Sequence, residues 1–207
     1  MTMEDLYSRR TNLIIGFHGC DEDVANKVVM GKDNLKASEN DYDWLGHGVY
    51  FWENNQERAL QWAVDNSKRK GSSIKKPAVL GAVIDLGFCF DLTDSKYLSE
   101  LKQGYNTLLD NISLIGVEMP QNTDIGNSHD KLLRKLDCAV IETVHSLNND
   151  ADVRPYDSVK GMFVEGDELY PGSGFNEKNH IQICLRNPNC IKGFFIPRKL
   201  DVAYGNP

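Results

Sequence analysis

The sequence predicts an α+β fold in a single domain, with short strands forming two packed sheets and helices along their flanks. Three observations predict it. Apolar runs of strand length recur along the chain, segments with apolar residues at helical spacing lie between several of them, and no internal repeat or low-complexity linker divides the 207 residues. A length of 207 residues suits one domain of good size.

The first predicted strand ends at a histidine. Residues 12–18 (NLIIGFH) have the apolar content of a short buried strand, which delivers His18 to its end. Residues 21–30 follow with valines at helical spacing and acidic residues in the first turn, where they suit the helix dipole. Gly31 ends this predicted helix.

A second strand and helix follow a polar, turn-rich segment at residues 38–44. Residues 49–52 (VYFW) are aromatic and β-branched, which predicts a strand. Asn54 or Asn55 can cap a helix from Gln56 to about residue 70.

The remaining chain predicts further short strands around one helical region. Residues 95–136 are predicted to be helical, with a loop around residues 120–127. The alternation of Ile181, Ile183 and Leu185 predicts the last clear strand. That strand spans residues 180–186, and the other predicted strands are residues 78–86, 89–92, 138–144 and 190–196. A loop at residues 148–150 leads to residues 156–159 and 161–165.

Composition excludes several classes of protein. There is no run of eighteen apolar residues, so no membrane span is expected, and the acidic first residues do not form a secretory signal. The five cysteines are odd in number and include no C-x-x-C pair, which argues against a disulfide framework and a structural zinc site and favours a reducing cytoplasm. We therefore expect a cytoplasmic protein without a bound metal.

The net charge of −7 does not favour phosphate-backbone binding across the whole surface. A local basic stretch, residues 68–70 with Lys75 and Lys76, is either a solvated helix end and loop or a contact for nucleic acid or a partner protein.

Two segments carry the candidate chemistry. The first is Phe17-His18-Gly19-Cys20, and the second is the segment LGHGVYFWE at residues 45–53. A histidine can hydrogen-bond a ribose hydroxyl, and a glycine lets a carboxamide approach the main chain. Tyr50 offers an aromatic face to a cationic ring. Taken singly, His18 and Tyr50 are better explained as core residues, and only their combination with Gly19, Gly46 and Gly48 favours a ligand pocket.

These motifs resemble the ADP-ribosyltransferase superfamily, in its diphtheria-toxin and poly(ADP-ribose)-polymerase branch. The resemblance continues in order through the helix with Ala59 and Trp62, the strand at residues 80–92 and the turn at residues 156–159. It finds no counterpart for residues 95–150, which are predicted to be an insert. The resemblance implies a split β-sandwich of two mainly antiparallel sheets in one catalytic domain.

The resemblance also implies a set of site residues. Counting back from Pro188 places Gln182 where the family carries its catalytic glutamate, so the implied catalytic triad is His18, Tyr50 and Gln182. Glutamine keeps a hydrogen bond to a ribose hydroxyl but lacks the negative charge and cannot act as a general base. The implied NAD-contacting residues are His18, Gly19, Lys36, Gly48, Tyr50, Trp62 and Ser158.

Nearby residues leave alternatives open. Glu165 or Glu177 could replace the missing carboxylate, although each is also explained as a surface residue. Trp44 is either a ring contact for the ligand or a core anchor, and Lys36 is either near the adenosine or simply exposed.

The resemblance implies a mono-ADP-ribosyltransferase that uses NAD as substrate and modifies a protein or a nucleic acid. The alternatives are an NAD glycohydrolase and a binding module that grips NAD or ADP-ribose without chemistry. A stand-alone bacterial toxin or phage-defence enzyme, with an antitoxin or regulatory protein as partner, fits this reading by analogy with relatives of the fold.

Overall fold

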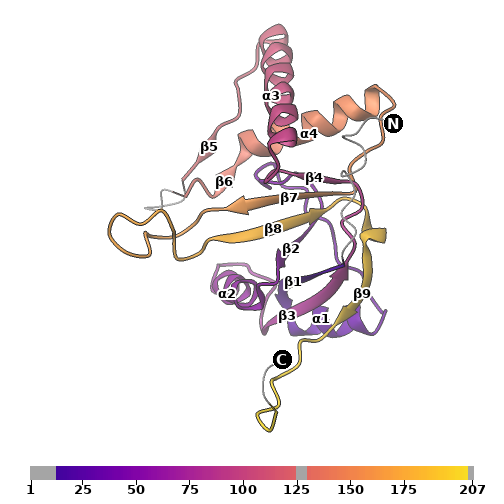
Figure 1. The fold of residues 1–207 in the computed structure, drawn as a ribbon, viewed down its shortest axis with the longest axis vertical. Helices are drawn as coiled ribbons and strands as arrows, with labels where there is room; N and C mark the ends of the chain where they lie inside the picture. Colours follow the sequence, from indigo (N-terminus) through magenta and orange to yellow (C-terminus); the bar gives the residue numbers. More distant parts are fainter. Residues whose placement is uncertain (1–12, 125–129, 205–207) are drawn as a thin grey trace.

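The computed structural model describes residues 13–124 and 130–204 and has an α+β architecture (Figure 1). Seven strands form one sheet in the order β4-β7-β8-β2-β1-β3-β9, and β5 pairs with β6 in a separate two-stranded sheet. Neighbouring strands are antiparallel except for β4 and β7, which are parallel. The predicted α+β class is confirmed, while the split into two packed sheets stays a prediction.

The strands are β1 (Ile14–Asp21), β2 (Val49–Glu53), β3 (Pro77–Ile84), β4 (Cys89–Asp91), β5 (Asn122–Thr123), β6 (Leu133–Arg134), β7 (Ser158–Phe163), β8 (His180–Leu185) and β9 (Ile191–Phe195). The helices are α1 (Glu22–Val29), α2 (Gln56–Ser67), α3 (Ser95–Ile115) and α4 (Lys135–Asp150), with a 3-10 turn at Pro188–Cys190.

Side-chain caps explain where the first three helices begin. Asp21, Asn55 and Asp94 each accept a hydrogen bond from a main-chain N–H in the first turn of the helix that follows, which satisfies one of its unpaired donors. Gly116 ends α3 in a left-handed conformation, with φ of 71°. The prediction that an asparagine caps α2 is confirmed for Asn55.

The strand predicted at residues 138–144 is wrong, because these residues belong to α4. The run CAVIETV is rich in β-branched residues, but the buried positions follow helical spacing: Cys138, Val140, Ile141, Val144 and His145. Packing on both the sheet and α3 stabilises the helix despite this local composition. The predicted helical region ends early, since β5 and β6 follow α3; residues 125–129 of the predicted loop lie outside the described residues.

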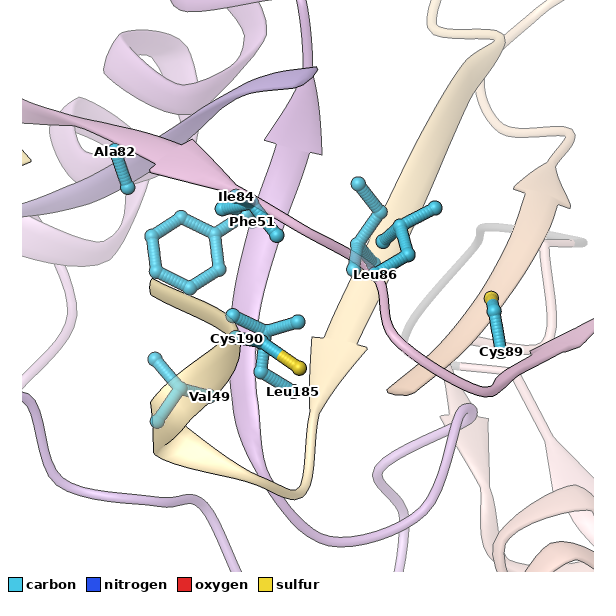
Figure 2. Packing of buried hydrophobic residues seen from close by; sticks show 9 residues of the cluster. Val49, Phe51, Ala82, Ile84, Leu86, Cys89, Leu185 and Cys190 are labelled. Atoms are coloured by element: carbon cyan, nitrogen blue, oxygen red, sulfur yellow. The ribbon is translucent and has the colours of Figure 1, made fainter. Parts of the chain in front are cut away.

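The sheet is buried on both faces. On one face, Phe51, Ile84 and Leu185 from three strands form an apolar cluster with Cys190 (Figure 2). On the other face, α4 buries Ile141 and Val144 against residues of β4, β7 and β8, so the predicted insert at residues 95–150 shares this core. Figure 1 shows α3 and α4 together at the β4 end of the sheet, and α1 and α2 near β1 and β3.

The junction of β1 and β2 is the feature that positions the candidate site. These strands pair only at Gly16 with Glu53 and at Phe17 with Trp52. Beyond Phe17, β1 continues alongside β3 as far as Asp21, while β2 continues alongside β8. The two central strands therefore separate immediately before His18.

Candidate functional site

The three residues of the predicted triad lie on three consecutive strands at this separation. His18 is the first residue of β1 beyond its pairing with β2. Tyr50 lies on β2 opposite Cys184, and Gln182 lies on β8 opposite Trp52. The fold thus brings together segments that are 32 and 132 residues apart in the sequence.

The three side chains do not all share one face of the sheet. Because Phe17 is opposite Trp52, strand alternation places Tyr50 and Gln182 on the Trp52 face and His18 on the Phe51 face. The ring of His18 contacts that of Phe51, with centroids 5.7 Å apart. A ligand that touches all three residues must therefore pass through the opening between β1 and β2.

His18 is held in one tautomer across this opening. Its Nδ1 lies 2.8 Å from the carbonyl oxygen of Tyr50, and since a carbonyl only accepts, Nδ1 carries the proton. Burial lowers the pKa of His18, so the ring is neutral at pH 7. Within the described residues Nε2 has no hydrogen-bond partner, which leaves it able to accept a hydrogen bond from a hydroxyl.

The main chain of Gly19 faces the same opening. Asn54 donates its N–H to the carbonyl of Ile15, so the odd-numbered residues of β1 direct their main-chain groups toward β2. At Gly19 the β2 register has already ended. Above this residue lies α2, and a Cβ here would come closer than 3.0 Å to the carbonyl oxygen of Ala59 and within 3.2 Å of Trp62.

The hydroxyl of Tyr50 holds the glycine turn that precedes its own strand. It accepts from the N–H of Leu45 at 3.0 Å and donates to the carbonyl of Gly46 at 2.8 Å. Burial raises the pKa of Tyr50 well above its usual value, so the phenol remains protonated. Tyr50 is therefore a structural anchor whether or not its ring also meets a ligand.

Close packing explains both glycines of this turn. Gly46 has φ of 77°, and a Cβ there would lie 2.5 Å from Glu142 Oε1. A Cβ on Gly48 would lie 2.5 Å from the carbonyl oxygen of Leu185. The turn thus fits against α4 on one side and β8 on the other.

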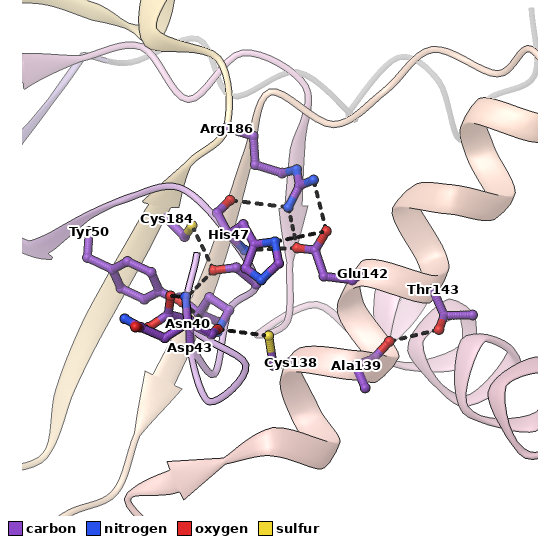
Figure 3. A network of polar contacts seen from close by, with 12 residues as sticks. Asn40, Asp43, His47, Tyr50, Cys138, Ala139, Glu142, Thr143, Cys184 and Arg186 are labelled. Carbon is purple, nitrogen blue, oxygen red and sulfur yellow. Dashed lines mark hydrogen bonds and ion pairs between the residues drawn. The ribbon is translucent and has the colours of Figure 1, made fainter. Parts of the chain in front are cut away.

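An ion pair fixes the same turn from α4 (Figure 3). Glu142 accepts from Arg186 Nη1 at 2.5 Å and Nη2 at 3.1 Å, and its Oε1 also accepts from the main-chain N–H of His47 at 2.8 Å. Burial opposes ionisation of Glu142, but these hydrogen bonds and the Arg186 charge outweigh it and lower its pKa. Sequence analysis missed this pair, since 44 residues separate its members.

Gln182 is buried and already engaged. Its Oε1 accepts a hydrogen bond of 2.6 Å from the indole Nε1 of Trp44. Only 9% of the residue is exposed. Trp44 is thus a direct neighbour of the residue in the family's catalytic-glutamate position.

The other predicted NAD contacts are placed as follows. Trp62 packs over Gly19 and has its ring centroid 5.8 Å from that of Trp52, and the structure shows no contact between it and the Tyr50 ring in the described chain. Ser158 is fully buried on the Phe51 face and donates to the carbonyl of Leu86 at 2.7 Å. Lys36 is exposed.

The two candidate replacement carboxylates differ in environment. Glu165 forms a buried ion pair with Arg58 at 2.5 Å, with 12% and 9% of their side chains exposed. Glu177 lies exposed in the loop before β8. Neither carboxylate contacts Gln182 within the described chain.

A cavity adjoins Trp44 on the side of α3 and α4. It has a volume of about 430 Å³ between α3 and α4, and its lining includes Leu101, Tyr105, Arg134 and Trp44. Trp44 is its connection with the predicted triad. This cavity was not predicted, because residues 138–144 of α4 were expected to form a strand.

The candidate metal ligands and the cysteines of the described residues are placed as follows. No group of three or more His, Cys, Asp or Glu within them is placed to hold a metal ion. All five cysteines are free and buried, and burial raises the pKa of Cys20, Cys138 and Cys190 to about 11.

No helix in residues 13–124 or 130–204 combines the length and apolar character needed to cross a membrane.

Comparison with known proteins finds one distant relative. An uncharacterized protein of Methanocaldococcus jannaschii is 24% identical over 195 residues, which cover 85% of this chain and 83% of that protein. No family model and no solved structure matches. The similarity extends along most of both chains and carries no activity with it.

Proposed function

We propose that this chain is a mono-ADP-ribosyltransferase, which cleaves NAD at the nicotinamide–ribose bond and transfers ADP-ribose to a macromolecule. The separation of β1 and β2 carries the proposal. The neutral His18 ring and the main chain of Gly19 lie where β1 leaves β2, and Gln182 lies on β8, the strand on the other side of β2. This is the combination of groups that the resemblance implies for NAD.

The residues suggest how NAD would be held. The N–H and C=O of Gly19 would pair with the nicotinamide carboxamide beneath α2, where Trp62 supplies an aromatic wall. Nε2 of His18 would accept a hydrogen bond from a ribose hydroxyl. Holding the ring and the ribose in this way would orient the bond that breaks.

The chemistry of Gln182 limits the reaction to a single transfer. An amide places no charge beside the cationic transition state and cannot take a proton from an acceptor hydroxyl. Glu165 cannot readily replace it, since its carboxylate is paired with Arg58. We propose that the acceptor, protein or nucleic acid, supplies its own nucleophile without a general base at this position.

The wider parts of this proposal follow from the same resemblance. They are a split β-sandwich opened between β1 and β2, a cytoplasmic location, and an antitoxin or regulatory protein as partner. The separation of β1 and β2 after Phe17 supports the first of these.

A second candidate is an NAD-binding module without turnover. The engagement of Gln182 by Trp44 and of Glu165 by Arg58 favours it, because an amide cannot act as a general base and the Glu165 carboxylate is held in an ion pair. Hydrolysis of NAD by water is a third outcome that the same experiment distinguishes.

The test uses purified protein with NAD labelled in its adenylate phosphate, incubated with cell lysate and then with protease or nuclease. The variants are His18→Ala and Gln182→Ala, and Glu118→Gln in the exposed segment after α3 is the matched control. Protease-sensitive label identifies a protein acceptor, and nuclease-sensitive label a nucleic-acid acceptor. Free ADP-ribose with nicotinamide identifies a glycohydrolase, and binding without turnover supports the second candidate.

The controls decide whether the site is correct. Label transfer that persists in His18→Ala and Gln182→Ala would contradict the proposed site. Absence of NAD binding by the folded wild-type protein, measured by calorimetry, would contradict both candidates.

A further inference from the structure

The contact between Trp44 and Gln182 has a fixed polarity. An indole N–H only donates, so the Gln182 atom that meets it at 2.6 Å must be the carbonyl oxygen and not the amide nitrogen. The usual ambiguity between the oxygen and nitrogen of a glutamine is therefore resolved by the chemistry of its partner.

The indole ring is held in place from several sides. Gly161 pairs with Gln182 across β7 and β8, and a Cβ on Gly161 would lie 2.8 Å from Trp44 Cη2, so the ring rests on bare backbone. The ring of Phe163 meets it edge-on with centroids 4.9 Å apart. The guanidinium of Arg134 lies 5.8 Å from the Trp44 ring centroid and 4.4 Å from that of Phe163.

The other end of the Gln182 amide has no partner in the described chain. No hydrogen bond of the described chain involves the Gln182 amide nitrogen, Nε2. This nitrogen is also not among the fully buried side-chain atoms that lack a partner. A primary amide carries two N–H donors at this nitrogen. With Oε1 turned toward Trp44, Gln182 presents donors where a glutamate would present only acceptors.

We propose that Trp44 is a positioning residue that orients the Gln182 amide, so that its NH₂ group meets an acceptor oxygen of the bound ligand. This inference rests on the proposed function, in which that oxygen belongs to the ribose of NAD. It makes Gln182 a hydrogen-bond donor to the ligand rather than a weakened copy of a carboxylate, and it makes Trp44 a determinant of ligand binding.

The first experiment does not depend on NAD. Indole and side-chain amide resonances are recorded by ¹⁵N NMR for the wild type, Trp44→Phe and Gln182→Met, a substitution that keeps the length of the side chain. The resonance missing in Trp44→Phe identifies the Trp44 indole. We expect that resonance to move upfield and its hydrogen exchange to quicken in Gln182→Met. An unchanged indole resonance would overturn the inference, whatever the protein binds.

The second experiment is a double-mutant cycle on NAD affinity, measured by calorimetry. We expect Trp44→Phe to weaken binding about threefold to tenfold in the wild-type background, the usual range for one hydrogen bond. In the Gln182→Met background the same change should have little effect, because Trp44 acts through Gln182. Equal effects in both backgrounds would show that Trp44 contributes independently and would overturn the positioning role.

Direct observation of the amide completes the test. On addition of NAD to the wild type, the Gln182 side-chain N–H resonances should shift downfield, and the shift should shrink in Trp44→Phe. Unaltered resonances on saturation with NAD would refute the donor role. If NAD does not bind the folded wild type, the proposed function fails and the donor role toward NAD fails with it, while the indole spectra still decide the Trp44–Gln182 contact. Melting temperatures show that each variant is folded, with Glu177→Gln as control.

Discussion

Replacing Gly19 by alanine is expected to destabilise the protein by about 3 kcal/mol, because α2 rests directly on the Gly19 main chain. The added Cβ would come closer than 3.0 Å to the carbonyl oxygen of Ala59, a distance that real Cβ atoms essentially never show. Since this oxygen belongs to helix backbone, no side-chain rotation relieves the clash. The cost should therefore lie at the upper end of the usual range of about 1–3 kcal/mol for overpacking.

The assay is urea or thermal unfolding followed by circular dichroism. In a chain of this size, 1 kcal/mol shifts Tm by about 2–4 °C, so Gly19→Ala should lower it by about 6–12 °C. Gly193 on β9 provides the matched control, since a Cβ there meets nothing within 4 Å. Gly193→Ala should stabilise slightly, by about 0.4–1 kcal/mol, because it restricts the unfolded chain.

The result that would refute the reasoning is a Gly19→Ala protein as stable as Gly193→Ala. Helix α2 would then not pack on Gly19 as described, and the proposed position of nicotinamide beneath α2 would be wrong. A destabilised variant carries a practical consequence as well. Loss of NAD binding in Gly19→Ala must be measured well below its Tm, because unfolding alone would abolish binding.

Three further predictions concern ionisable side chains that are buried or partly buried. Glu165→Gln should lower the free energy of unfolding by about 3 kcal/mol, because it leaves the buried Arg58 guanidinium without a compensating charge. Glu177→Gln in the exposed loop should change this free energy by less than about 0.5 kcal/mol. Equal stabilities of the two variants would contradict the buried pair. The pKa of His145 is lowered to about 4, chiefly by burial. Between pH 6.5 and 4 the unfolded chain therefore binds a proton at this residue that the folded protein does not bind. The free energy of unfolding should fall by up to about 3 kcal/mol as the pH drops through that window. An NMR titration midpoint near 6.5 for His145 would exclude this. Hydrogen bonds and the Arg186 charge lower the pKa of Glu142 in the folded protein. Its contribution to the free energy of unfolding is therefore complete above the usual glutamate pKa and is lost as the pH falls through the folded pKa. In Glu142→Gln the free energy of unfolding, measured with urea from pH 6 to 3, should depend less on pH.

Much of the fold follows from local sequence signals. A strand through His18, the Asn55 cap and the alternation along β8 were all readable, because each rests on neighbouring residues. The predicted end of that strand at His18 is wrong, since β1 continues to Asp21 by pairing with β3. The run at residues 138–144 was misread because β-branched residues suit a strand locally. Its helical spacing becomes clear only when Val140, Ile141, Val144 and Leu147 are compared over a longer window.

The site was less predictable, because its contacts join distant segments. The sequence located Gln182 by its distance from Pro188, but nothing local indicates that an indole 138 residues earlier holds its oxygen. The same holds for Glu142 with Arg186. Long-range pairs of this kind depend on the order of strands in the sheet, which the sequence pattern leaves undetermined.

The structure also changes which part of the motif carries information about function. Gly46 and Gly48 are required by the fit of their turn against α4 and β8, and the Tyr50 hydroxyl holds that turn. A protein without any activity toward NAD would need the same three residues to build this core. Folding makes no such demand for Nε2 of His18 or the amide nitrogen of Gln182, which have no partner in the described chain. Each has one end fixed by the protein and the other left open, which is the arrangement expected of groups that bind a ligand, and these two ends are therefore where substitutions should separate binding from stability.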